Sequence, residues 1–360
     1  MKKHALGLAV TAITTALAAP AIALADGPTL YGKLNVSLDS IDTDTGATAT
    51  STNNFQLNSN ASRIGIKGDT ETGIQGLKGL YYAEFGVDVD DGTVPFTQRN
   101  IYAGLKGGFG TLRLGKIDTP LKDAQGKVDQ FNDLAADIAN LTAGETRANN
   151  SIYYSSPKIA GGLTLNLALY PGEGVDVDNA DGDNNTATDV EEGIADSLSA
   201  SVVWEKDALY AALAIDQNGS GSGNLAGFTD INGATTGTPS VADIVRAVVV
   251  YKADAFEVGA LYQAAEDVGD ATDAGEDTAL VVSGAYKLDK WKFKAQYGTN
   301  TGDVSSAAAD RERTITALGA DYALGKSTTL FGYWAEVNND PESAARPVTT
   351  IVSIGLDQKF

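Results

Sequence analysis

The chain has 360 residues, with 47 Asp and Glu against 26 Lys and Arg, which gives a formal net charge of -21 at pH 7. It contains no Cys, and this excludes disulfides, thiolate nucleophiles and Cys-ligated metals. A surface this acidic repels phosphate backbones, so nucleic acid is not an expected partner.

The first 25 residues have the features of a secretory signal peptide. A basic start precedes an Ala-rich apolar run over 5–24, and small residues lead to a predicted cleavage after Ala25. A membrane-spanning helix is the weaker alternative, because the run is short and is broken by Thr residues and by Pro20. We therefore expect an exported protein.

Removal of the predicted signal leaves residues 26–360 and takes away His4, the single His of the chain. Ser-His-Asp triads, zinc-binding HExxH motifs and histidine acid–base catalysis all need an imidazole that the remaining chain lacks. We therefore expect neither an enzyme nor a bound cofactor.

Apolar and polar residues alternate along most of the remaining chain. From Leu163 to Leu169 every odd position is Leu, and from Trp291 to Tyr297 bulky or apolar residues alternate with Lys and Gln. Successive strand residues point to opposite faces, so each such segment has one apolar and one polar face. Sixteen strands are predicted in this way, over 29–39, 55–67, 77–89, 97–106, 111–117, 150–157, 162–170, 196–205, 208–216, 243–252, 255–265, 278–287, 290–299, 312–323, 327–337 and 347–360. Because strand ends are predicted only to within a few residues, fourteen or eighteen strands also fit.

The connections between these strands favour an all-β transmembrane barrel. Tight turns such as 107–110 and 289–290 alternate with long polar stretches such as 171–195 and 217–242, an arrangement typical of outer-membrane barrels. Aromatic residues lie toward strand ends, as interfacial girdles do: Trp204, Tyr262, Tyr286, Trp291, Tyr297 and Tyr322. The alternative is a soluble β-sandwich, in which the apolar faces of two sheets would pack together.

Four stretches, taken in chain order, resemble the general-diffusion porins of Gram-negative outer membranes. They are Thr29-Leu30-Tyr31-Gly32-Lys33, Ser62-Arg63-Ile64-Gly65-Ile66-Lys67-Gly68, Tyr102-Ala103-Gly104-Leu105-Lys106-Gly107, and Leu114-Gly115-Lys116 leading into Asp118-Thr119-Pro120. An amphipathic last strand ending in Phe360 resembles the assembly signal of such barrels. The resemblance covers residues 26–360 and implies a sixteen-stranded antiparallel barrel, a homotrimer in outer-membrane lipid, and a water-filled pore narrowed by the third extracellular loop.

Basic residues of the expected constriction follow from this resemblance. Lys33 and Arg63 match positions where the family places basic side chains on the barrel wall, and alternation turns both of them inward. Lys116 matches by motif, but alternation groups it with Leu114, so a bulge or a strand end would be needed to turn it inward. Arg147 is the fourth candidate. The alternative for each of these residues is a solvated surface charge.

The connection 118–149 is longer than chain closure needs and is predicted to be the constriction loop. Within Lys127–Leu141 the apolar period becomes helical, and this predicts a helix with one apolar face. Asp129, Asp133 and Asp137 stand four apart and would form one acidic row opposite the basic wall. The apolar face, expected to pack on the inner wall, consists of Val128, Phe131, Leu134, Ile138 and Leu141. The alternative is an external helix with a solvated acidic face.

A metal site is not predicted. Asp181, Asp183, Asn185 and Glu192 occupy EF-hand-like spacing, but Thr186 stands where that loop needs Gly. A solvated acidic loop is the preferred interpretation.

The sequence therefore predicts an outer-membrane porin for passive diffusion of small hydrophilic solutes and ions, with a preference for cations. The alternatives are a substrate-selective outer-membrane channel and a closed structural or adhesive barrel. An aromatic slide for sugars is not expected, because the inward-facing Tyr31, Tyr82 and Tyr102 lie on separate strands.

Overall fold

A computed structural model describes residues 27–44, 51–91, 96–171, 193–195, 197–217, 242–267, 276–302, 311–341 and 347–360. The predicted signal peptide lies outside these ranges. Strands of the first half are β1 (Thr29–Asp44), β2 (Ser51–Ser59), β3 (Arg63–Glu71), β4 (Lys78–Gly86), β5 (Thr97–Gly107), β6 (Gly110–Asp118), β7 (Arg147–Ser155) and β8 (Leu163–Tyr170). Strands of the second half are β9 (Ser197–Lys206), β10 (Leu209–Gln217), β11 (Ala242–Lys252), β12 (Phe256–Asp267), β13 (Glu276–Leu288), β14 (Trp291–Gly302), β15 (Arg311–Ala323), β16 (Thr328–Pro341) and β17 (Val348–Lys359).

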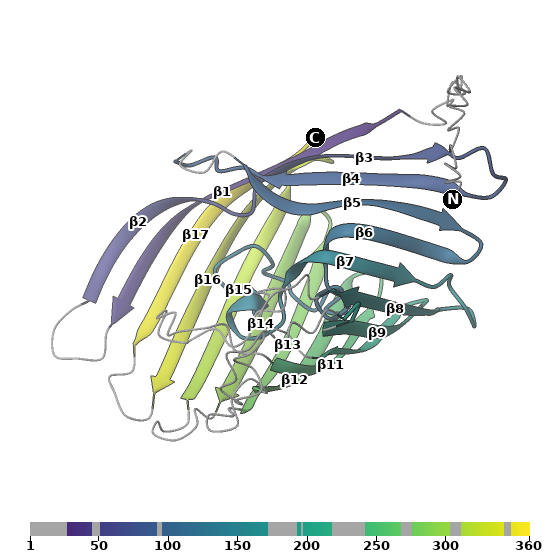
Figure 1. The fold of residues 1–360 in the computed structure, drawn as a ribbon. Helices are drawn as coiled ribbons and strands as arrows, with labels where there is room; N and C mark the ends of the chain where they lie inside the picture. Colours follow the sequence, from purple (N-terminus) through teal and green to yellow (C-terminus); the bar gives the residue numbers. More distant parts are fainter. Residues whose placement is uncertain are drawn as a thin grey trace, which may run out of the picture.

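These strands form one closed antiparallel sheet (Figure 1). From β3 to β17 each strand pairs with the next in the sequence, and β1 closes the ring by pairing with β17 from Lys33–Lys359 to Asp44–Val348. Both β2 and β3 pair with β1, β2 along its second half and β3 along its first five residues. Together they form a single strand interrupted at 60–62, and this confirms the predicted sixteen-stranded barrel.

The closure is secured by the last residue of the chain. The Gly32 amide donates to the Phe360 carbonyl at 3.0 Å, and the Phe360 amide donates to the Gly32 carbonyl at 3.1 Å. The Phe360 ring lies where a β-carbon on residue 32 would stand. Only glycine therefore fits this closing contact without displacing the terminal ring.

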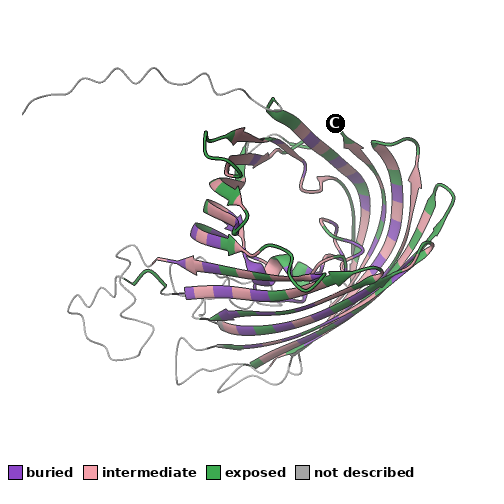
Figure 2. Ribbon diagram, turned by 90° about the vertical axis from the view of Figure 1, so that its right-hand side faces the viewer, coloured by how far each residue is buried: buried purple, intermediate pink, exposed green. Residues whose placement is uncertain are grey.

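Burial alternates along most strands, and apolar rather than polar residues take the exposed positions, the reverse of a soluble protein (Figure 2). Large apolar residues point outward, with Leu318 55% and Ile354 64% exposed, whereas polar residues such as Gln296 and Asn300 point inward at 3% and 5%. An apolar exterior around a polar interior is the pattern of a barrel in lipid. A single closed sheet also excludes the sandwich alternative. No helix in the described part of the chain is long and apolar enough to cross a membrane.

The main hydrophobic core lies inside the ring of strands. It is formed by residues 119–146, the connection between β6 and β7, which we call the inner segment, and by inward-facing residues of β10–β17. Figure 1 shows this segment within the barrel. The wall contributes Ile244, Val248, Leu261, Val281, Ile315 and Phe331, among others. The core thus fixes the inner segment against one side of the lumen.

Candidate functional site

The helix predicted over Lys127–Leu141 is wrong. The inner segment contains only a four-residue helix α1 (Pro120–Asp123) and a 3-10 turn η1 (Ile138–Asn140). Asp133 adopts a left-handed conformation with φ 66°, which no α-helix accommodates. Side chains of Asp129 and Asp137 bind backbone amides of the segment, and such local bonds compete with helical ones.

The apolar residues that suggested a helix are nevertheless buried together. Val128, Phe131, Leu134, Ile138 and Leu141 are at most 9% exposed and belong to the core between the segment and the wall. The Phe131 ring packs edge-on against Tyr333 of β16, with a centroid distance of 5.9 Å. Burial at every third or fourth residue is achieved here by an irregular chain lying on a curved sheet.

Polar side chains of the wall bind the backbone of the inner segment. Gln296 accepts from the Gln130 amide and donates to the Ala136 carbonyl, both at 2.9 Å. Asn300 donates to the Leu141 carbonyl at 2.7 Å. These bonds satisfy backbone groups that have no partner in regular secondary structure, and so they fix the path of the segment.

Arg246 of β11 is the strongest anchor and was missed by the sequence analysis. It is completely buried, and its guanidinium forms an ion pair of 2.7 Å with Glu145. It also donates to the carbonyls of Leu121 and Ala143 at 3.2 and 2.9 Å, and to Gln263 of β12. One side chain thus holds both ends of the inner segment. The signal in the sequence that could have indicated it is a single Arg among the otherwise apolar inward positions of its strand.

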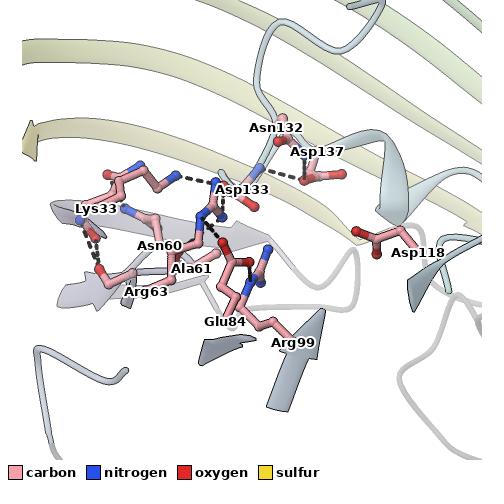
Figure 3. Close-up of polar contacts among 12 residues, drawn as sticks. Lys33, Asn60, Ala61, Arg63, Glu84, Arg99, Asp118, Asn132, Asp133 and Asp137 are labelled. Atoms are coloured by element: carbon pink, nitrogen blue, oxygen red, sulfur yellow. Dashed lines mark hydrogen bonds and ion pairs between the residues drawn. The ribbon is translucent and has the colours of Figure 1, made fainter. Parts of the chain in front are cut away.

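Two of the predicted basic residues meet the inner segment at Asp133 (Figure 3). Lys33 Nζ lies 2.7 Å and Arg63 Nη1 3.3 Å from Asp133 Oδ2. Burial opposes ionisation of this carboxyl, but the Lys33 ammonium, its hydrogen bond and the Arg63 charge outweigh burial and hold the pKa of Asp133 below its ordinary value. The aspartate therefore carries its negative charge in the lumen.

Glu84 and Arg99 extend this cluster, and the sequence analysis missed both. Glu84 of β4 accepts from Arg99 of β5 at 2.7 Å and lies 3.8 Å from Arg63 Nε. It also accepts hydrogen bonds from the hydroxyls of Tyr31 and Tyr82, at 2.9 and 3.1 Å. Alternation from the inward-facing Tyr82 could have indicated that Glu84 lies on the inner face, but only strand pairing brings these five side chains together.

Lys116 and Arg147 lie in a neighbouring cluster, away from Asp133. Arg147 pairs with Asp118 at 3.1 Å, and Lys116 Nζ donates to Asn149 at 2.7 Å. The β6–β7 register shifts between Gly115 and Ile117, so the irregularity that an inward Lys116 would require is present at that residue.

Asp129 and Asp137 bond to the inner segment itself. Asp129 accepts from the amides of Phe131 and Ile138, and Asp137 accepts from those of Asp133 and Ala139. Burial, followed by repulsion from Asp137, raises the pKa of Asp129 above its ordinary value. The predicted row of three carboxylates depended on the helix and is therefore not formed.

The weak metal candidates Asp181, Asp183, Asn185 and Glu192 lie outside the described residues. Within the ranges that the structure covers, no group of three or more acidic side chains is placed to hold a metal ion.

An apolar outer face, sixteen strands in a closed ring and a charged, narrowed interior define a transmembrane β-barrel of the porin class. A sequence profile described as Gram-negative porin matches residues 9–342. The chain belongs to the Gram-negative porin family, and the predicted outer-membrane location is confirmed.

Individual relatives agree with this assignment. The chain is 25% identical to the major outer membrane protein P.IB of Neisseria lactamica over 377 aligned residues, which cover all of both proteins. The fold is similar to an anion-selective porin from Comamonas acidovorans, with a TM-score of 0.70, 20% identity, and coverage of 93% of this chain and 99% of that one. It is also similar to a trimer form of OmpT from Vibrio cholerae, with a TM-score of 0.64, 17% identity, and coverage of 93% and 100%.

Proposed function

We propose that the protein is a passive diffusion channel for small hydrophilic solutes and ions in the outer membrane. The observation that carries this proposal is the Lys33–Asp133 contact, which joins the barrel wall to the inner segment inside a polar lumen. A segment fixed at this place narrows the passage. Solutes are then selected by size and polarity, and this selection needs no dedicated binding site.

The charges of the constriction come from two elements that are in direct contact, the barrel wall and the inner segment. Lys33, Arg63 and Arg99 project from the wall, and Asp133 comes from the inner segment (Figure 3). Charged side chains that line a narrow channel produce a strong local field. Such a field orients water and dipolar solutes, so it favours their passage over that of apolar molecules of similar size.

We assign the cation preference to the acidic charge of the whole protein rather than to the constriction. At the constriction Asp133 is paired with basic side chains, and Asp129 has a raised pKa. The stretch 172–192, by contrast, contains eight Asp and Glu and no Lys or Arg. A net charge of -21 concentrates cations near the barrel. The anion-selective porin of similar fold is only 20% identical, so its selectivity does not transfer.

The ion preference is tested by the reversal potential across a salt gradient, measured at low and high ionic strength. A cation preference at about 0.03 M salt that weakens at about 1 M supports long-range charge as its cause, because the Debye length falls to about 3 Å. Anion preference at low salt contradicts the assignment.

A sugar-selective channel is the second candidate, and the arrangement of tyrosines bears on it. Tyr82 and Tyr102 stack at 5.2 Å, with an interplanar angle of 2°, and Tyr31 lies 6.0 Å from Tyr82. Lys67 covers the Tyr31 ring at 4.9 Å and Arg113 lies over the Tyr102 ring at 5.5 Å. The tyrosines lie on separate strands, as the sequence predicts, but strand pairing brings them into one row, in which their faces are covered. Ring faces occupied in this way favour the general channel over an aromatic slide.

We further propose a homotrimer, because OmpT of Vibrio cholerae has been solved in a trimer form and shares this fold. Planar-bilayer conductance of the purified, folded protein tests the channel and its assembly together. Large steps in groups of three support a trimeric channel, and single steps support a monomeric one. A folded barrel without conductance contradicts the channel and favours a closed structural or adhesive barrel.

A further inference from the structure

Glu84 occupies an unusual position for a carboxylate in a channel wall. It lies on β4 and is only 5% exposed, although it borders the charged constriction. Two tyrosine hydroxyls donate to Oε2, and Arg99 Nε donates to Oε1. A carboxylate with several strong donors stays ionised and holds a single orientation.

The donors to Glu84 come from different strands and are themselves fixed. Tyr31 lies on β1, Tyr82 on β4 and Arg99 on β5. The tyrosine row restrains both hydroxyls, since its rings pack at 5.2 and 6.0 Å. Arg63 of β3 lies 3.8 Å from the same carboxylate. Glu84 therefore lies within ion-pair distance of both Arg63 and Arg99.

The contact of Glu84 with the arginines changes the net charge of the cluster. The wall carries three positive charges near the passage, from Lys33, Arg63 and Arg99, and two negative groups face them, Asp133 and Glu84. Asp133 belongs to the inner segment, whereas Glu84 is part of the barrel. Without Glu84 the excess positive charge of this cluster rises from one to two.

We propose that Glu84 is the specificity-determining residue of the barrel wall, which offsets and orients Arg63 and Arg99 so that the excess positive charge at the constriction, and with it the advantage of anions, stays small. This inference rests on the channel function proposed above. It places a determinant of ion preference on the barrel wall rather than on the inner segment, where the sequence predicted a row of carboxylates.

The expected effect follows from Coulomb's law. One unit charge about 5 Å from a permeating ion in water changes the occupancy of that ion by roughly a factor of four at low salt. Glu84→Gln removes one negative charge while it keeps the size and shape of the side chain. The permeability ratio of cations to anions should therefore fall several-fold at about 0.03 M salt.

The experiment measures reversal potentials of four variants and the wild type in planar bilayers. Glu84→Gln should move the ratio toward anions, and Arg99→Gln should move it toward cations. The double variant should return close to the wild-type ratio, because the charge balance is restored. Glu71→Gln is the matched control, since Glu71 is a half-exposed carboxylate that pairs with Lys78 beyond the cluster. It should leave the ratio unchanged.

The double variant separates charge balance from a merely structural role. If the two substitutions acted by disturbing the structure, their effects on the permeability ratio would add in the double variant instead of cancelling. If Glu84→Gln fails to fold, the opposite shift of Arg99→Gln still tests the balance. A wild-type ratio in either single variant overturns the proposal. A wild-type barrel that does not conduct would instead contradict the channel function itself, so the two failures are distinguishable.

Discussion

Replacement of Arg246 by Met should release both ends of the inner segment while the barrel remains closed. The buried guanidinium binds Glu145 at 2.7 Å and the carbonyls of Leu121 and Ala143 at 3.2 and 2.9 Å. Met fills much of the same volume but donates no hydrogen bond. The Glu145 carboxylate and two backbone carbonyls then lose their partner in a buried environment.

The size of the effect can be estimated from these contacts. Removal of one partner of a buried ion pair costs about 3–5 kcal/mol, because the remaining charge is left uncompensated. The carbonyl bonds are part of the same network, so their separate values of about 1.5–3 kcal/mol do not add to this cost. Gln296 and Asn300 still hold the middle of the segment. We therefore expect local release of its ends and no unfolding of the sheet.

Single-channel recording and limited proteolysis measure this release. Arg246→Met should increase the open-channel current noise, lower the voltage at which the channel closes, and expose residues 119–146 to protease. Lys252→Met is the control on the same strand, because Lys252 is 57% exposed and pairs only loosely with Glu257 at 3.6 Å. If Arg246→Met shows wild-type noise, closing voltage and protease resistance, the anchoring argument is refuted.

Three further predictions concern the core, the charge pair and the closure. Phe131→Ala should destabilise the packing of the inner segment by about 3–5 kcal/mol and increase the unit conductance, which bilayer recording measures; an unchanged conductance and melting temperature would contradict it. The lowered pKa of Asp133 means that its pair with Lys33 contributes fully above the ordinary Asp value of about 3.9 and is lost only as the pH falls through the lowered pKa. Channel noise should therefore stay at its neutral-pH level down to about pH 4 in the wild type, and Asp133→Asn should be noisier throughout this range; equal noise in both proteins would contradict the assigned role. Gly32→Val should displace the Phe360 ring and lower the yield of folded barrel in refolding assays, whereas a wild-type yield would show that the closing contact is dispensable.

The strand alternation was sufficient to predict the barrel. Its two-residue period assigns each side chain to the lipid face or the lumen face regardless of the tertiary arrangement, so the inward position of Lys33 and the outward position of Leu34 followed from the sequence. The motifs around Lys33 and Arg63 indicated the family in the same way. These features are local, and local patterns can be detected in a single sequence.

The predicted helix failed for a physical reason that the sequence does not contain. Apolar residues at helical spacing indicate only that one side of the segment is buried. An irregular chain that lies on a curved wall can bury the same residues. The choice between the two depends on donors such as Gln296 and Asn300, which follow their partners in the inner segment by 160 and 159 residues and reach its backbone only in the closed barrel.

The charged site, too, was determined partly by the sequence and partly by the tertiary structure. The sequence by itself determined that the chain forms a barrel with basic residues on the inner face of the wall and an acidic segment between β6 and β7. Only the tertiary structure decided which charges meet: Asp133 contacts Lys33 across 100 residues, Asp129 bonds to its own segment, and Glu84 joins the arginines. Pairing across strands depends on the register and on the path of the inner segment, and both are set by packing inside the closed ring.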